Sequence, residues 1–231
     1  MSSITENLAV IKQRIQRACL RANRDPAQVK LIGVSKTVPA DRVREGIQAG
    51  VTLLGENYVQ EAQEKIAQLQ GLGASWHFIG HLQSNKARVA VDLFDLIHTV
   101  DRNSLAKELN RRAEQTGRRL DVLLEVNVGE EASKSGASQQ DLVALFRYAS
   151  SLDGLAVRGL MALPPYLEDP EQVRPYFQQM RVLLDRLRQD AARPEQLSEL
   201  SMGMSHDFEV AIEEGATFIR VGTALFGERL K

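Results

Sequence analysis

Short apolar runs alternate with longer amphipathic runs along this chain, and no other feature restricts the possible folds as strongly. The apolar runs predict strands, and the amphipathic runs between them predict helices. We expect strands at residues 30–35, 52–55, 76–79, 96–99, 121–127, 156–162, 199–202 and 217–221. We expect helices at roughly residues 40–49, 57–69, 84–92, 102–116, 139–151, 170–190 and 206–214.

This alternation indicates right-handed βαβ units and a parallel sheet. Eight strands in 231 residues favour a closed (β/α)8 TIM-type barrel over an open doubly wound sheet. Two segments support a repeated unit, because GIQAGVTLLGEN (46–57) and AIEEGATFIRVG (211–222) share one pattern of helix end, glycine, threonine and apolar strand. Gly50 and Gly215 are expected to take the left-handed conformation that ends a helix.

A separate helix is predicted before the barrel. Ser3 with Glu6 forms a capping-box pattern, and apolar spacing of four and three continues to about Ala22. The Pro-bearing stretches 162–170 and 192–196 are only as long as loops. Residues 1–231 are therefore expected to form one domain.

Composition excludes several classes of function. With 29 basic and 30 acidic residues and no basic run, the chain shows no footprint for nucleic acid or anionic lipid. The single cysteine, Cys19, excludes an internal disulfide and lies on an apolar helix stripe. The polar N-terminus is unlike a signal peptide, and no apolar run approaches the ~20 residues of a membrane span, so we expect a cytoplasmic protein. Four scattered histidines show no metal-ligand spacing, so no metal site is predicted.

Polar residues and glycines lie at or just after the ends of the expected strands, where barrels of this type carry their active sites. They are Lys36, Glu56, Asn57, His81, Gln83, Asn85, Asp101, Asn127, Ser201, Gly203, Ser205, Arg220, Gly222 and Thr223. The last two strands are followed by Ser-Gly-Ser and Gly-Thr, each before a helix. Phosphate binding is favoured by free backbone N–H groups, hydroxyl donors and the start of a helix. The alternative is that the serines only cap a helix and the glycines only form turns.

The predicted phosphate site also bears on the role of Lys36. Desolvation at the end of a buried strand frees a lysine amine to attack an aldehyde, whereas an isolated lysine there would simply reach solvent. A phosphate site together with such a lysine is what pyridoxal phosphate requires. No glycine motif for binding nucleotides is present.

Four stretches now identify a resemblance: KLIGVSKTV, LLGENYVQE, WHFIGHLQSNK and LSMGMSHDFEVAI with IRVGTALFG. Together they make the chain similar to the pyridoxal-phosphate homeostasis protein family, which resembles the barrel half of alanine racemase. The resemblance implies that Lys36 carries the internal aldimine and that Arg220 contacts the pyridine nitrogen. It also implies that the phosphate region comprises Ser201, Gly203, Ser205, Gly222 and Thr223.

Other polar residues have less defined roles. A guanidinium only donates hydrogen bonds, so Arg220 would keep the ring nitrogen unprotonated, unless it serves an ion pair instead. Asn57 is a candidate for a contact with the ring. His77 or His81 could face the cofactor or form a hydrogen bond within a loop.

We therefore expect a carrier or homeostasis factor for pyridoxal 5'-phosphate, without substantial catalysis and with no catalytic residues. Apoenzymes that depend on this cofactor are candidate recipients. The alternative is a pyridoxal-phosphate-dependent amino-acid racemase in which a loop residue such as Tyr58 or Tyr166 supplies the second face. Racemisation needs an acid and a base on both faces of the carbanion, and only Lys36 is evident. The chain resembles alanine racemase without its β domain, which favours a monomer.

Overall fold

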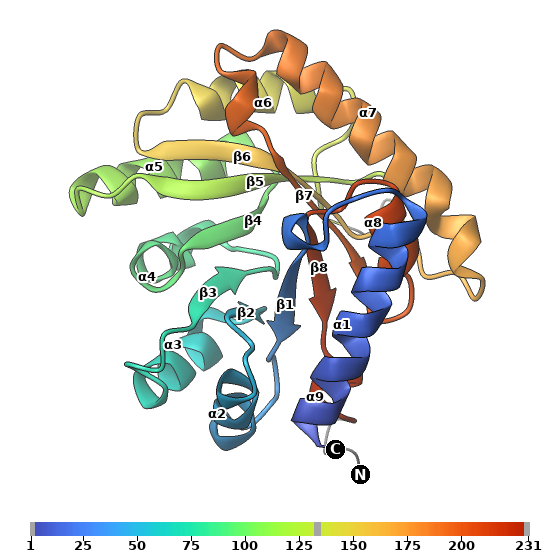
Figure 1. Cartoon of the computed structure of the whole chain (residues 1–231). Coiled ribbons are helices and arrows are strands. Elements are labelled where there is room, and N and C mark those ends of the chain that lie inside the picture. The colour runs from blue at the N-terminus through green and yellow to red at the C-terminus, as the bar shows by residue number, and fades with distance from the viewer. Residues whose placement is uncertain (1–2, 132–134, 229–231) are drawn as a thin grey trace.

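The computed structural model describes residues 3–131 and 135–228, and within them eight parallel strands form a closed barrel (Figure 1). The strands follow one another round the barrel in the order in which they occur in the sequence. Their bounds are β1 Lys30–Val34, β2 Leu53–Glu56, β3 Ser75–Phe78, β4 Leu96–Val100, β5 Leu120–Val126, β6 Leu155–Ala162, β7 Glu199–Met204 and β8 Phe218–Val221. The predicted (β/α)8 barrel is confirmed, and each strand ends within two residues of its expected position.

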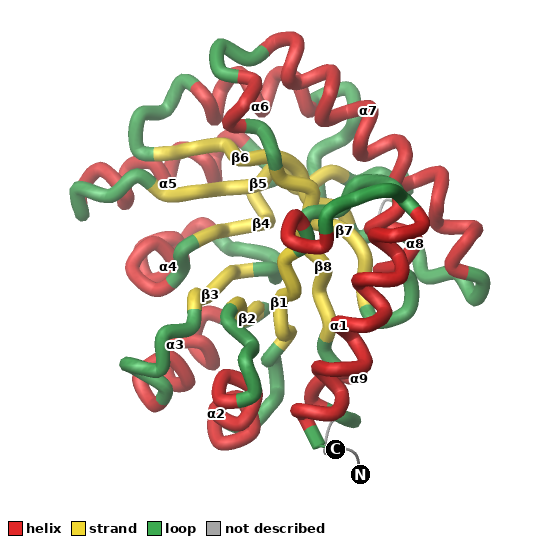
Figure 2. The backbone as a smooth tube through the Cα atoms, in the orientation of Figure 1, coloured by secondary structure: helices red, strands yellow, loops and turns green. Residues whose placement is uncertain are grey.

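Helices alternate with the strands and surround the barrel, as the tube in Figure 2 shows. The α-helices are α1 Ile4–Arg21, α2 Ala40–Gln48, α3 Val59–Gln68, α4 Ala87–Leu93, α5 Asn103–Gln115, α6 Leu142–Ser150, α7 Arg174–Asp190, α8 Phe208–Glu213 and α9 Thr223–Phe226. Short 3-10 turns are η1 Pro26–Gln28, η2 Ser84–Lys86, η3 Pro170–Val173 and η4 Pro194–Gln196. None of these helices of the described chain is long and apolar enough to cross a membrane.

Two expected helices open with a 3-10 turn that the prediction did not include. The helices expected at 84–92 and 170–190 each open with a 3-10 turn, η2 and η3, before α4 and α7 start. In η3 a proline occupies the first turn, and the side chain of Asp169 accepts the N–H of Glu171. Proline lacks an N–H and fixes φ, so it suits such a first turn, which sequence periodicity alone does not reveal.

The helix before the barrel is confirmed together with its cap. Ser3 N donates to Glu6 Oε2 at 2.8 Å, and Glu6 N donates to Ser3 Oγ at 3.2 Å, which completes the capping box. Arg14 pairs with Glu209 of α8 at 2.7 Å, and Asn7 Nδ2 donates to Leu225 O of α9 at 3.0 Å. Helix α1 is thereby fixed against the last helices of the chain (Figure 1).

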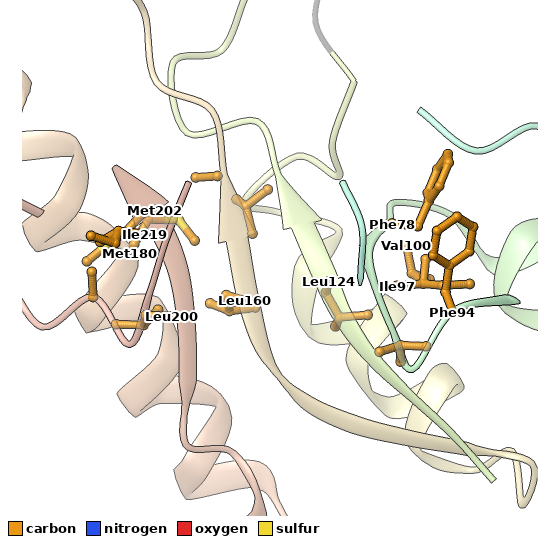
Figure 3. Packing of buried hydrophobic residues seen from close by; sticks show 14 of the residues in the cluster. Phe78, Phe94, Ile97, Val100, Leu124, Leu160, Met180, Leu200, Met202 and Ile219 are labelled. Carbon is orange, nitrogen blue, oxygen red and sulfur yellow. The ribbon is translucent and has the colours of Figure 1, made fainter. Parts of the chain in front are cut away.

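The main core lies between the strands and the helices (Figure 3). Phe78 and Phe94 pack with their ring centroids 5.1 Å apart, and both are essentially inaccessible to solvent. A second, smaller cluster comes from five strands and comprises Ile32, Leu96, Leu123, Met161 and Phe218. These side chains make the barrel a packed core rather than a pore. Burying each of them stabilises the fold by about 1.5–3 kcal/mol.

Strand β8 closes the barrel by pairing with β1, with Ile32 opposite Arg220 and Gly33 opposite Val221. Residues from the two ends of the sequence therefore meet at one place. Because all strands are parallel, their carboxyl ends form one mouth of the barrel, and the segments after β1 and β8 are neighbours there.

Candidate cofactor site

Lys36 lies at this mouth, two residues after β1, and is half-buried. The segment after β8 runs alongside it. A Cβ placed on Gly222 would lie 3.5 Å from Val34 Cβ and 3.6 Å from Val34 O, which is ordinary contact distance. The structure thus brings the predicted Lys36 and Gly222 segments together.

Arg220 belongs to a hydrogen-bonded chain of buried side chains that crosses the barrel interior. Its Nη1 donates to Ser201 Oγ at 2.6 Å, and Ser201 Oγ lies 2.9 Å from His98 Nδ1. His98 Nε2 in turn lies 3.0 Å from His77 Nδ1. The chain links four strands: β8, β7, β4 and β3.

The protons along this chain can be assigned. Arginine only donates, so Ser201 Oγ accepts from Arg220, and the buried Ser201 hydrogen needs an acceptor of its own. Among the described residues, His98 Nδ1 is the atom placed to accept it. We therefore assign the His98 proton to Nε2, which donates to His77 Nδ1. Burial lowers the pKa of His98 well below its usual range and that of His77 to about 4, so both rings are neutral at neutral pH.

Arg220 remains charged although it is buried. Burial lowers its pKa to about 10, and the carboxyl groups of Asp207 and Glu125 oppose that effect. Its Nη2 also donates to Ala162 O at 2.8 Å. Only two of the five N–H donors of this guanidinium bond to described residues, so donors remain for a ligand.

The other residues predicted for the phosphate region lie within or just after β7 and just after β8. Gly203 needs its missing side chain, because its φ is +89° and a Cβ there would lie 2.6 Å from Ala211 Cβ. Ser205 is half-buried in the turn before α8, and its hydroxyl has no hydrogen-bond partner within the described chain. Thr223 is exposed at the start of α9. Ser201 differs from these, since its hydroxyl already serves Arg220 and His98.

Asn57 carries an orphaned polar atom at the end of β2. Its Oδ1 is buried and has no hydrogen-bond partner in the described ranges. Gly80 packs against its backbone so closely that a Cβ on Gly80 would lie 2.4 Å from Asn57 O. A buried amide without a partner is uncommon in proteins and fits a site that a polar ligand completes.

The other sequence candidates lie toward solvent or within loops. His81 Nδ1 lies 3.1 Å from Ser135 Oγ, so His81 forms a hydrogen bond between two loops, while His77 lies inside the barrel. Tyr58 and Tyr166 are 58% and 70% exposed.

Sequence reasoning missed two buried residues of the site, His98 and Glu125. Both are buried polar residues in mostly apolar strands, β4 and β5, and that interruption of the apolar pattern was the available signal. Burial raises the pKa of Glu125 to about 7, with Asp101 adding to the effect and Arg220 opposing it. Glu125 Oε2 has no partner among the residues that the structure describes.

Comparison with known proteins assigns the family. Residues 2–230 match the family described as alanine racemase, N-terminal domain. The chain is 50% identical to the pyridoxal phosphate homeostasis protein of Aquifex aeolicus, with 97% of each chain covered. It is 47% identical to the protein of the same name from Pseudomonas aeruginosa, over 99% of this chain and 97% of that one. The chain belongs to the pyridoxal phosphate homeostasis protein family. The resemblance inferred from the sequence motifs is thereby confirmed.

Solved structures agree with this family assignment. PipY of Synechococcus elongatus with pyridoxal phosphate bound has a TM-score of 0.85 and 42% identity, covering 97% of this chain and 100% of that one. Alanine racemase of Corynebacterium glutamicum has a TM-score of 0.73 at 18% identity. The match covers 97% of this chain and 61% of that one. The racemase therefore shares the fold of the barrel.

Proposed function

We propose that this protein binds pyridoxal 5'-phosphate and acts in its intracellular homeostasis and delivery, with Lys36 as the covalent attachment point. Closure of the barrel by β8 and β1 carries this proposal, because it sets the Lys36 loop beside the segment that holds Arg220 and Gly222. The family assignment and the cofactor bound to PipY support it.

The residues present fit this cofactor. Arg220 keeps unused donors for a ring nitrogen, and Asn57 keeps a buried amide oxygen without a described partner. We propose that Ser205, Gly203, Gly222 and Thr223 take the phosphate. When bound, the cofactor supplies an aldehyde that a lysine amine attacks and a ring that withdraws electrons.

Ser201 has a different role in this proposal from the one that the resemblance implied. Its hydroxyl fixes Arg220 through an uncharged chain that continues to His98. A charged guanidinium held in this way cannot protonate the ring nitrogen, which weakens the cofactor as an electron sink. This arrangement supports storage of the cofactor over catalysis on it.

We further propose that the protein is a cytoplasmic monomer of one domain without substantial catalysis. Racemisation requires a positioned acid or base on each face of the substrate. Tyr58 and Tyr166, the residues considered for the second face, are largely exposed. Tyr166 instead contacts His206, with the two rings tilted and their centroids 5.1 Å apart.

A cofactor-binding experiment tests the proposal. Purified protein mixed with pyridoxal 5'-phosphate is expected to turn yellow and to lose the colour on treatment with borohydride. Mass spectrometry should then locate the reduced adduct on the peptide that contains Lys36, and Lys36→Ala should lack it while keeping its circular dichroism spectrum. A protein that stays colourless with added cofactor contradicts the proposal.

A further inference from the structure

The backbone on both sides of Lys36 is held by side chains of one neighbouring helix, α3. On one side, Lys65 Nζ donates to the carbonyl oxygen of Ser35 at 2.6 Å. On the other side, the N–H of Thr37 donates to Glu61 Oε1 at 2.5 Å. Lys65 and Glu61 also pair with each other at 2.9 Å, so the two contacts form one unit around Lys36.

The Lys65 ammonium is buried and fully engaged. Its side chain is only 6% exposed, and its three hydrogens have three acceptors: Ser35 O, Glu61 Oε1 and Glu56 Oε1, the last at 2.6 Å. An amine attacks an aldehyde through its nitrogen, and the Lys65 nitrogen is enclosed by these three acceptors. Lys65 therefore serves as a donor and leaves Lys36 as the nucleophile at this mouth.

Glu56 anchors the unit to the barrel. Its side chain is inaccessible to solvent, and Oε1 accepts from both Lys65 Nζ and Ser35 Oγ, each at 2.6 Å. Burial raises the pKa of Glu56, while the hydrogen bonds from Lys65 and Ser35 lower it. The end of β1, the end of β2 and α3 are thus joined by one buried ion pair.

The conformation of Thr37 shows that the loop depends on such contacts. Its φ is +62°, in the left-handed region that favours glycine. A threonine remains in this region only where its surroundings hold it there, and the bond to Glu61 ends on the Thr37 amide itself.

We propose that Lys65 and Glu61 are positioning residues that fix the backbone around Lys36 and so present its amine to the aldehyde of the cofactor. This inference rests on the proposed function. In the reaction concerned, the neutral Lys36 amine attacks the aldehyde carbon, and a carbon–nitrogen double bond replaces the carbon–oxygen bond. The aldehyde oxygen leaves as water, with both hydrogens of the amine.

Four variants of α3 separate positioning from general damage. Glu61→Ala removes the acceptor of the Thr37 amide, whereas Glu61→Gln keeps an oxygen able to accept it. Glu64→Ala is the matched control, because Glu64 is an exposed glutamate on the same helix. Lys65→Met removes the buried donor, and where that variant fails to fold, the Glu61 pair decides.

Three measurements are made on each variant. They are the rate at which the coloured adduct forms, the affinity for pyridoxine 5'-phosphate, and the hydrogen exchange of the Thr37 amide without cofactor. Pyridoxine 5'-phosphate has an alcohol in place of the aldehyde, so it reports the ring and phosphate contacts alone. Glu61→Ala is expected to slow adduct formation by about tenfold or more, as a misplaced group does. It should also speed Thr37 exchange and leave the affinity for the analogue unchanged, and Glu61→Gln should restore most of the rate.

The outcomes are distinguishable. If wild-type protein forms the adduct and Glu61→Ala matches it in rate and in Thr37 exchange, the positioning role is wrong. Equal losses of adduct rate and analogue affinity would also contradict it, since they indicate a collapsed site. If the wild type forms no adduct, the proposed function fails. Faster exchange of the Thr37 amide in Glu61→Ala than in the wild type would then still show that Glu61 holds the backbone at Thr37.

Discussion

Arg220 Nη1 donates a hydrogen bond of 2.6 Å to Ser201 Oγ, and this contact joins the last strand of the barrel to the one before it. Both side chains are buried, and Ser201 passes the connection on to His98. A charged group is thereby held inside the barrel by neutral partners. Removing any partner would leave a buried polar atom unpaired, which costs more than the hydrogen bond itself contributes.

Ser201 and Ser205 should therefore respond differently to the same substitution. Ser201→Ala leaves a guanidinium N–H and His98 Nδ1 unpaired, so we expect the free energy of unfolding to fall by about 1–3 kcal/mol. Ser205→Ala removes a half-buried hydroxyl without a described partner, so it should leave stability unchanged and weaken cofactor binding. Urea denaturation without cofactor, followed by titration with it, checks both. Equal stability of the two variants would contradict the assignment.

The stability of the cofactor-free protein should depend on pH through Glu125. The pKa of this carboxyl is raised from 4.5 to about 7, mainly by burial. Between these values the unfolded chain has lost the proton that the folded chain keeps, so folding takes up a proton. The stabilisation is complete below about pH 4.5 and is lost as the pH rises through about 7.

Glu125→Gln should remove this dependence. Between about pH 5 and pH 8, the wild type should lose on the order of 1 kcal/mol more than the variant. His77 and His98 have the opposite effect on the free energy of unfolding. Because their pKa values are lowered in the folded state, that free energy falls as the pH drops below about 6.5. Comparing the two proteins at each pH cancels that contribution. Parallel curves of unfolding free energy would show that Glu125 titrates normally.

Two glycines of the proposed phosphate region form a second matched pair. Gly203→Ala puts a Cβ 2.6 Å from Ala211 Cβ at a φ of +89°, so we expect a loss of about 1–3 kcal/mol in stability. Gly222 has a φ of −107°, and a Cβ there meets Val34 at ordinary distances, so Gly222→Ala should fold normally. Thermal unfolding separates them. Weaker binding of pyridoxal 5'-phosphate by a stable Gly222→Ala would place the cofactor against that backbone.

The protein with cofactor bound should not racemise free amino acids at enzymatic rates. In the proposed site Arg220 keeps the ring nitrogen unprotonated, and one missing acid or base costs about 10²–10⁴ in rate. Incubation with L-alanine in deuterated water, with Cα exchange followed by NMR, gives the test. Turnover of about 1 per second or faster would establish the racemase alternative instead.

The barrel was predictable because its pattern is local and repeated. Gly50 and Gly215 end their helices with φ values of +106° and +107°, as the repeated αβ segments indicated. The start of α7 was less predictable, because a 3-10 turn and an α-helix share similar apolar spacing over one turn.

The candidate site was predictable only where a side chain able to bind or react lies near the carboxyl end of a strand. Lys36, two residues after β1, and Arg220, one residue before the end of β8, stand out in this way, and the closed barrel places their strands side by side. Lys65 does not stand out, since a glutamate four residues before a lysine on a helix usually marks an exposed pair. Its burial against Ser35 and Glu56 depends on how α3 packs on two strand ends, which only the tertiary structure contains.

Barrel closure also has a consequence for when the protein becomes able to load its cofactor. Lys36 is synthesised early, whereas Arg220 and Gly222 lie among the last dozen residues of the described chain. A ribosome-bound chain that still lacks β8 has Lys36, the proposed attachment point, but neither Arg220, the proposed partner of the cofactor ring, nor the strand that pairs with β1 to close the barrel. If the cofactor binds at the proposed site, only a chain with a closed barrel can capture it, and a bound cofactor then shows that the barrel has been completed.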